Sequence, residues 1–224
     1  MRKILVTGAS KGLGLVVANA FEAQGDTVIR WGRAQLDYLK IEGWNCIIPH
    51  YTEIDVVIHC AGGGLGLRGP YLTAEAAHQL FMVNLGGAME LNRIIGPEMQ
   101  HRGSGTLIHV CSIASGEAVG SVGYNTVKAA LGAYVRSLGR AMAPYGVIVT
   151  GIAPGGFQAP GNAMERLSAN NPPAYQEFIE ERLPRGRMGE AEELIPLLKY
   201  LASPEASMMG GCLVPIDAGE GHYY

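Results

Sequence analysis

A tyrosine and a lysine stand four residues apart in this chain, at Tyr124 and Lys128. On a helix, this spacing puts both side chains on one face. A nearby ammonium stabilises the phenolate form of a phenol, which makes the phenol a usable general acid or base. Tyr-x-x-x-Lys also arises often by chance, so the spacing taken alone favours a surface pair.

Two other polar residues could serve the same site. Ser112 follows the apolar run 107–111, at the carboxyl edge of an expected strand, where open α/β sheets bind ligands. Its hydroxyl could bind a substrate carbonyl oxygen, although Ser115 is a nearby rival and such serines are more often turn residues. Asn84 lies in an apolar helical stretch, where a buried amide must find partners. A structural amide at a helix kink is the alternative for Asn84.

The glycine-rich turn at residues 7–14, TGASKGLG, follows an expected strand and opens a helix. Backbone N–H groups and the helix dipole favour an anion there, so we expect the pyrophosphate of a dinucleotide, although any tight turn favours glycine. The segment 28–33, which covers the end of the second strand and the residues directly after it, holds no acidic residue to bind a ribose 2′-hydroxyl. Lys11 and Arg33 could instead bind a 2′-phosphate, which favours NADP and leaves NAD possible. Alternatively, both are solvated surface cations.

Short β-branched runs alternate with longer helical stretches along the whole chain. This pattern predicts an α/β fold: one domain over 1–224 with a doubly wound, Rossmann-type parallel sheet of about seven strands and helices on both faces. We expect strands over 4–6, 27–31, 45–48, 55–60, 106–111, 147–152 and 212–216, and helices over 12–24, 35–41, 73–99, 124–142 and 191–202. Too few residues join 48 to 55 for a crossover helix, so these strands are not neighbours or one is misassigned.

The stretch 157–188 is the one long segment without a clear period, and Pro172, Pro173 and Pro184 interrupt it. Long insertions in a compact domain are usually functional, so this segment is expected to be a substrate lid.

Composition narrows the class of protein. The 224 residues are 48% hydrophobic and 17% charged, which fits one soluble globular unit. The net charge of −3 gives no excess of basic residues, so binding to nucleic acid is not expected. No apolar run of 18 residues and no cleavable leader is present, so we expect a cytoplasmic protein without a membrane partner. The four cysteines, Cys46, Cys60, Cys111 and Cys212, lack metal-ligand spacing and are expected to be buried reduced thiols, with no metal site.

Six motifs, in order, resemble the signature of the short-chain dehydrogenase/reductase family, and the general look is that of its 3-oxoacyl-carrier-protein reductase type. They are the glycine turn, Cys60-Ala61-Gly62-Gly63, Asn84, Ser112, the Tyr124 to Lys128 segment, and Ala153-Pro154-Gly155-Gly156. The likeness extends to residues 187–193 and 210–219, so it spans essentially the whole chain.

The resemblance implies an NAD(P)-dependent oxidoreductase, here one that moves a hydride between NADP(H) and a carbonyl or secondary alcohol. Ser112 would polarise the carbonyl, Tyr124 would transfer the proton, Lys128 would bind the nicotinamide ribose, and Asn84 would hold a relay water. The implied cofactor contacts are Gly8, Ser10, Lys11, Gly12, Leu13, Gly14, Arg33, Cys60, Ala61, Gly62, Tyr124, Lys128, Pro154, Gly155, Gly156 and Phe157.

The chain departs from the family pattern in three places. His59-Cys60 replaces a frequent Asn-Asn pair, so other contacts must steady the central sheet. The threonine that often follows the Pro-Gly motif is missing, and His50 or Tyr51 would stand in for an absent Asp beside the adenine. The missing crossover helix makes this a shortened member.

Two other functions stay open at this stage. One is an epimerase or dehydratase that retains its nicotinamide and returns the hydride, and the other is a non-catalytic nucleotide-binding scaffold. Small residues at 129–133 suit close helix packing, in a homodimer or homotetramer or against the chain's own sheet.

Overall fold

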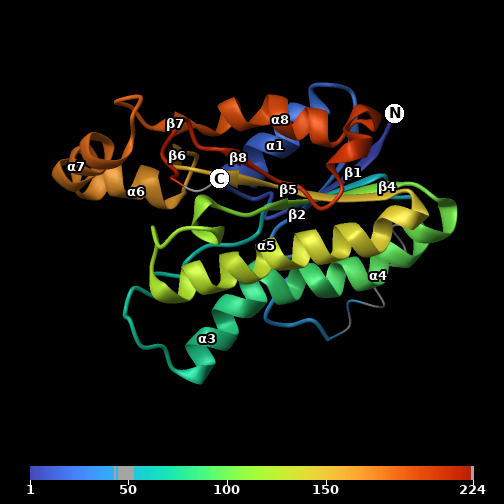
Figure 1. Ribbon diagram of the computed structural model, residues 1–224, viewed down its shortest axis with the longest axis horizontal. Helices are drawn as coiled ribbons and strands as arrows, with labels where there is room; N and C mark the ends of the chain where they lie inside the picture. Colours follow the sequence, from blue (N-terminus) through green and yellow to red (C-terminus); the bar gives the residue numbers. More distant parts are fainter. Residues whose placement is uncertain (43, 45–52, 223–224) are drawn as a thin grey trace.

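The computed structural model describes residues 1–42, 44 and 53–222. Within them, six parallel strands form one sheet between two helical layers (Figure 1), in the order β2-β1-β3-β4-β5-β8. The strands are β1 (Lys3–Thr7), β2 (Thr27–Trp31), β3 (Val56–His59), β4 (Gly105–Val110), β5 (Val147–Pro154) and β8 (Leu213–Ile216). The predicted doubly wound α/β fold is confirmed, while the strand expected over 45–48, together with Cys46, His50 and Tyr51, lies outside the described residues.

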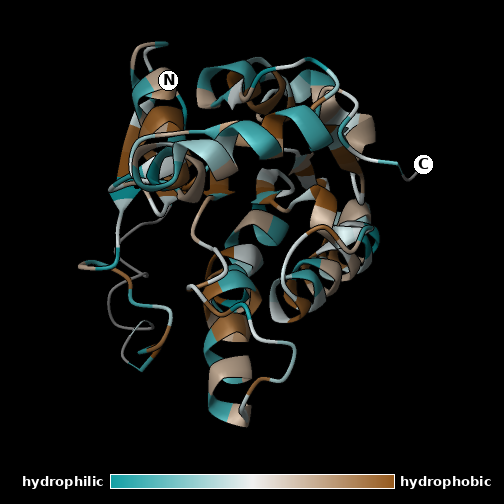
Figure 2. Ribbon diagram, turned by 90° about the vertical axis from the view of Figure 1, so that its left-hand side faces the viewer, coloured by the Kyte–Doolittle hydropathy of each residue, from teal (hydrophilic) through white to brown (hydrophobic). Residues whose placement is uncertain are grey.

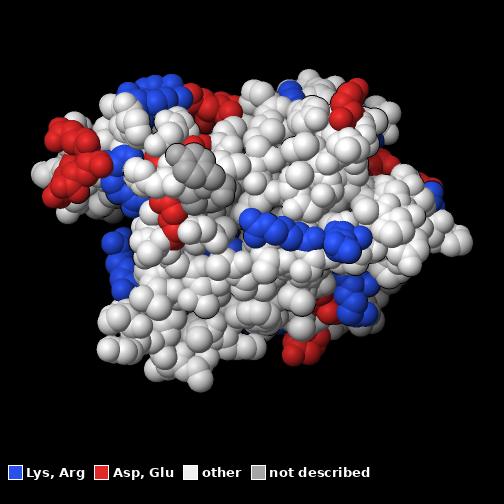
Figure 3. Space-filling model, in the orientation of Figure 1, with Lys and Arg blue, Asp and Glu red and all other residues white. Residues whose placement is uncertain are grey.

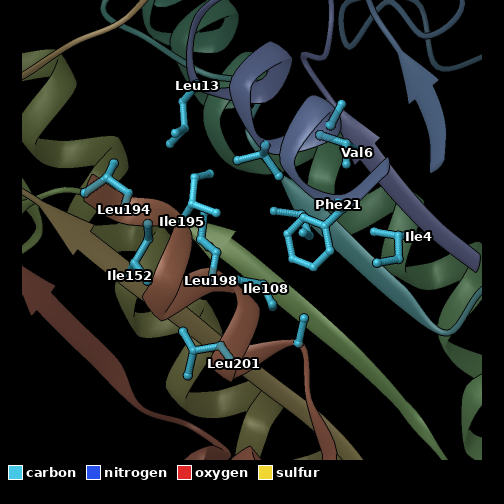
Figure 4. Close-up of a cluster of buried hydrophobic side chains, with 14 of the residues drawn as sticks. Ile4, Val6, Leu13, Phe21, Ile108, Ile152, Leu194, Ile195, Leu198 and Leu201 are labelled. Atoms are coloured by element: carbon cyan, nitrogen blue, oxygen red, sulfur yellow. The ribbon is translucent and has the colours of Figure 1, made fainter. Parts of the chain in front are cut away.

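The two faces of the sheet are covered by different helices. Helices α1 (Gly12–Glu22) and α8 (Ile195–Leu201) lie on one face, and α4 (Gly87–Arg102) and α5 (Val122–Met142) lie on the other (Figure 1). Because successive strand residues point to opposite faces, the apolar runs are buried on both sides. On the α1 side, Phe21 and Leu198 pack on Ile4 and Ile108 (Figure 4).

The segment after β2 folds into turns, so the helix predicted over 35–41 is wrong. Asp37 Oδ1 accepts the Leu39 N–H at 3.0 Å, and such local side-chain bonds compete with a helix. Tyr38 and Trp44 are nonetheless buried on the α4 side of the sheet. A Cβ at Gly87 of α4 would lie 2.2 Å from the Tyr38 ring, so this glycine makes room for the segment.

The helix expected over 73–99 consists of three elements: α3 (Ala74–Phe81), a π-helical turn η2 (Met82–Gly86) and α4. Thr73 caps α3 by accepting the Ala76 N–H at 3.2 Å. Such π-helical turns are frequent at functional sites, and Asn84 lies within this one.

The segment 157–188 is more regular than expected. It holds α6 (Ala163–Asn170) and α7 (Pro172–Arg182), and β6 (Phe157–Gln158) pairs with β7 (Gly189–Glu190). Pro172 and Pro173 were expected to interrupt helical structure, but they occupy the first turn of α7, where no backbone N–H donor is needed. Asn162 and Asn171 cap the two helices with their side chains.

These two helices form one end of the molecule and expose polar outer sides (Figure 2). Figure 3 shows acidic side chains gathered at this end, where α7 carries the exposed Glu177, Glu180 and Glu181.

Residues 191–202, as predicted, are helical, with the short η5 (Ala191–Leu194) leading into α8. The shorter 3₁₀ turns are η3 (Ile113–Ser115), η4 (Ala143–Tyr145) and η6 (Pro204–Met209). Among the described helices, none has the length and apolar character needed to cross a membrane.

Candidate active site

The order of the strands reverses at β1, so the carboxyl end of β1 is the topological switch point of the sheet. From β1 the chain passes through α1 to β2 on one side, while β3 lies on the other side of β1, and open α/β sheets bind ligands at such switch points. Gly8 and Ala61 follow the two strands that meet there. A Cβ at Gly8 would lie 2.9 Å from Ala61 Cα, so only glycine permits this approach.

The glycine turn presents backbone N–H groups at the start of α1. Gly14 packs the helix on the strand, because its Cβ would lie 2.4 Å from the Gly8 carbonyl oxygen. Among the described residues, no side chain caps α1, and the first turn of this helix holds no acidic residue. The Gly12 N–H donates to the Pro160 carbonyl oxygen at 2.7 Å, so residues just before α6 reach this turn.

The predicted cations flank the same turn. Ser10 touches the loop after β2, since a Cβ at Gly32 would lie 3.1 Å from Ser10 Cβ. Lys11 and Arg33 are exposed on these adjoining loops. Arg30, by contrast, is bound by both carboxylate oxygens of Glu22, at 2.8 and 2.7 Å.

The tyrosine and the lysine lie together in the first turns of α5. Lys128 Nζ is 5.6 Å from the centre of the Tyr124 ring. The lysine is only 3% exposed, and its ammonium donates to the Val110 carbonyl oxygen at 3.0 Å. An ammonium carries three donors, so this bond leaves further donors for a ligand.

Asn84 fixes the loop after β3. Its Oδ1 accepts the Gly63 N–H at 2.9 Å, and its Nδ2 donates to the carbonyl oxygens of Gly63 and Leu80, both at 3.0 Å. The sequence left open whether this residue is a structural amide, and the structure gives its side chain these structural bonds. A Cβ at Gly62 would lie 2.9 Å from Asn84 Oδ1 and 3.4 Å from Lys128 Nζ, so the loop passes between the two residues.

The same loop reaches the tyrosine, because a Cβ at Gly64 would lie 3.9 Å from Tyr124 Cδ2. Ser112 follows β4, two residues after the carbonyl that Lys128 binds. Its Oγ accepts the Ala114 N–H at 3.1 Å, which leaves the hydroxyl hydrogen to donate elsewhere. The rival Ser115 packs against Gly132 of α5 and has a buried hydroxyl oxygen.

Pro154, Gly155 and Gly156 lie at the carboxyl end of β5, as expected, and Phe157 begins β6. The Gly156 N–H donates to Glu220 Oε2 at 2.5 Å. Sequence reasoning did not identify Glu220 or its partner Arg182. The available signal is an acidic residue between Gly219 and Gly221, in the turn that follows the last strand.

His59 and Cys60, which depart from the family pattern, are supported by buried contacts. His59 Nε2 lies 2.8 Å from Asn92 Oδ1 on α4. Burial raises the pKa of the Cys60 thiol to about 12, so this residue is not a nucleophile at neutral pH. Cys60, Cys111 and Cys212 are free thiols, as predicted, but the predicted burial of the residue is confirmed only for Cys111, since Cys60 and Cys212 are partly exposed residues.

The chain was compared with known proteins. Residues 44–220 match the family model described as enoyl-(acyl carrier protein) reductase. The short-chain reductase protein NovJ of Streptomyces niveus is 27% identical, with 96% of this chain and 92% of that protein covered. L-xylulose reductase of Bos taurus is 27% identical, with 97% and 96% covered. A crystal structure from Beutenbergia cavernae, of a putative NAD(P)-dependent gluconate 5-dehydrogenase with bound NADP, is 26% identical with a TM-score of 0.87 and covers 98% of this chain and 96% of its own.

Proposed function

Because this chain belongs to the short-chain dehydrogenase/reductase family of oxidoreductases, we propose that it interconverts a carbonyl group and a secondary alcohol with NADP(H). One observation carries this proposal: the phenol of Tyr124, the buried ammonium of Lys128 and the Asn84 amide converge on a single loop, 62–64, after β3. That loop also adjoins the glycine turn, because Gly8 contacts Ala61.

The residues present fit a dinucleotide. The first turn of α1 has neither a side-chain cap nor an acidic residue, so its N–H groups and dipole suit a pyrophosphate. A Cβ at Gly12 would meet its nearest atom, the Pro160 carbonyl oxygen, only at 4.0 Å, so there is room beside this residue, but its own N–H is already donated to that oxygen. The further donors of the Lys128 ammonium suit the hydroxyl groups of a nicotinamide ribose.

The electrostatics around the adenosine end support NADP over NAD. Lys11 and Arg33 lie on adjoining loops, and residues 32–36, directly after β2, hold no carboxylate to bind the 2′-hydroxyl. Arg30 is held by Glu22 and Asn19, so it does not contribute to this preference. A phosphate between two cations gains charge-assisted hydrogen bonds that a hydroxyl does not.

The reaction follows from the polar groups of the site. A bound nicotinamide cofactor supplies or accepts the hydride. In the reductive direction, the Ser112 hydroxyl donates a hydrogen bond to the carbonyl oxygen, and the Tyr124 hydroxyl gives this oxygen its proton. The Lys128 ammonium stabilises the phenolate left on Tyr124. Asn84 holds the loop that packs against both residues, and we expect segment 157–188 to close over the substrate.

The experiment is a screen of the purified protein for oxidation of NADPH and NADH with a panel of ketones, repeated with Tyr124→Phe. The substitution removes the acidic hydrogen while preserving the ring, so we expect the rate to fall about 100-fold or more. Tyr145→Phe, the same change at an exposed phenol in η4, is the matched control and should keep the wild-type rate. A Tyr124→Phe variant as active as wild type would refute the assigned proton donor.

A further inference from the structure

Among the described Asp, Glu, Lys and Arg residues, Lys128 and Glu220 are the two that are buried as whole residues. The proposed reaction uses the lysine, but it has no role for the glutamate. The carboxyl side chain of Glu220 is 2% exposed. A carboxylate this deeply buried is costly unless its oxygens are paired, so its partners indicate what it does.

The partners of Glu220 come from two separate segments. Its Oε1 accepts from Arg182 Nη2 at 2.7 Å, at the end of α7. Its Oε2 accepts the Gly156 N–H at 2.5 Å, directly after β5. The carboxylate therefore joins the expected lid helix to the turn expected to line the nicotinamide.

Arg182 extends this connection to a third segment. Its Nη1 donates to the Val119 carbonyl oxygen at 3.1 Å, in the loop that follows Ser112. The guanidinium also lies over the Phe178 ring of α7, 5.0 Å from the ring centre. Because both ends of the guanidinium are bound and its face is covered, Arg182 is fixed in one orientation.

The adjoining glycines accommodate this carboxylate. A Cβ at Gly155 would lie 2.6 Å from Glu220 Oε2, and a Cβ at Gly156 would lie 3.4 Å from it. The C-terminal segment is itself anchored, because Asp217 Oδ2 accepts the Gly221 N–H at 3.1 Å and Glu117 accepts the His222 N–H. Burial raises the pKa of Glu220, which the Gly156 N–H and the Arg182 charge oppose.

We propose that Glu220 is a positioning residue that latches α7 over the active site, by joining Arg182 of α7 to the Gly156 turn. Glu220 acts through these two partners and does not touch the substrate. The expected effect on substrate capture rests on the proposed function, whereas the expected effect on the mobility of α7 does not. Loss of the latch should free α7 and weaken substrate capture, while proton transfer at Tyr124 continues.

The test compares Glu220→Ala, which removes both acceptor oxygens, with Glu220→Gln, which retains one. Glu90→Gln is the control, because Glu90 likewise binds an arginine, Arg93, but lies on α4, away from α7. Hydrogen exchange of the α7 amides, measured on the ligand-free protein, needs no activity. We expect exchange to rise on the order of 10-fold in Glu220→Ala, less in Glu220→Gln, and not in Glu90→Gln.

Kinetics provide the second readout. We expect KM for the ketone to rise on the order of 10-fold in Glu220→Ala, with kcat changed less than about 3-fold. Unchanged α7 exchange in Glu220→Ala, or a fall in kcat at constant KM, would overturn the latch. If Glu220→Ala does not fold, the α7 exchange of Glu220→Gln decides. If wild type oxidises neither cofactor but Glu220→Ala still frees α7, the proposed function fails and the latch stands.

Discussion

A stacked pair of histidines, His59 on β3 and His109 on β4, should make this fold sensitive to mild acid. The two rings lie 4.4 Å apart at an angle of 11°, and both residues are buried. Asn92 stands between their polar edges, with Oδ1 2.8 Å from His59 Nε2 and Nδ2 3.3 Å from His109 Nε2. The orientation of this one amide therefore determines the tautomer of both rings.

An amide oxygen only accepts and an amide nitrogen only donates, so the two imidazoles carry their hydrogens on different atoms. His59 is protonated on Nε2, and His109 is protonated on Nδ1. The second amide hydrogen of Asn92 is donated to the Tyr134 hydroxyl at 3.1 Å. A proton added to His109 Nε2 would face the Asn92 amide hydrogens, and one added to His59 Nδ1 would meet no partner within the described residues.

Burial accordingly lowers the pKa of His59 from 6.5 to about 4 and lowers that of His109 as well. The folded state binds fewer protons than the unfolded state, so the stability is complete above pH 6.5 and is lost as the pH falls toward 4. For His59 alone, linkage gives a loss of about 2 kcal/mol between pH 7 and pH 5. His109 adds to this loss in the same direction.

Urea denaturation at pH 7 and pH 5 measures this loss. The comparison is between wild type and His59→Asn, which cannot titrate in this range. We expect the free energy of unfolding of wild type to fall by about 2 kcal/mol more than that of the variant. Nitrogen-15 spectra at neutral pH should show the Nε2–H tautomer for His59 and the Nδ1–H tautomer for His109. Equal pH dependence in the two proteins, or the opposite tautomers, would refute the buried neutral pair.

Two further predictions concern the glycine turn and the cofactor. Gly14→Ala should lower the free energy of unfolding by ~2 kcal/mol, because its Cβ would overlap the Gly8 carbonyl oxygen. The control Gly96→Ala, inside α4, should change this free energy by less than about 1 kcal/mol, because its Cβ has no neighbour within 4 Å and the helical gain of alanine over glycine is opposed by the following Pro97. Thermal or urea denaturation checks both, and a neutral Gly14→Ala would contradict the packing argument. Replacing Lys11 and Arg33 by Gln should reduce the NADPH over NADH preference in kcat/KM about 10-fold or more, and Arg30→Gln should not change it. An unchanged preference in the double variant would remove the 2′-phosphate assignment.

The sequence predicted the parallel sheet well because its signals are local. The apolar runs of β1, β3 and β4 are buried on both faces, which requires an uninterrupted run of apolar residues. The turn at 7–14 was identifiable because glycine spacing reflects backbone conformation, with positive φ at Gly8 and Gly12. Assembly as a homo-oligomer and a cytoplasmic location stay predictions.

The wrong predictions concern residues whose structural effect depends on their neighbours. Proline interrupts the interior of a helix but is favoured in its first turn, and the Asn171 cap places Pro172 and Pro173 in the first turn of α7. Residues 35–41 have a helical pattern, but Asp37 turns the chain so that Tyr38 can fill the space above Gly87. This space is formed by α4, which lies far along the chain, so the local sequence around residue 38 does not predict it.

The active site is specified as much by missing side chains as by reactive ones. Gly62 lets the loop pass between Asn84 and Lys128, and Gly155 admits the Glu220 carboxylate. In both places, a single methyl group would come within 3.0 Å of a polar oxygen, a distance that Cβ atoms do not adopt. A polar motif alone, such as an isolated Tyr-x-x-x-Lys, is therefore weak evidence for a functional site. The same motif becomes stronger evidence when glycines at the ends of neighbouring strands allow the backbone to approach it.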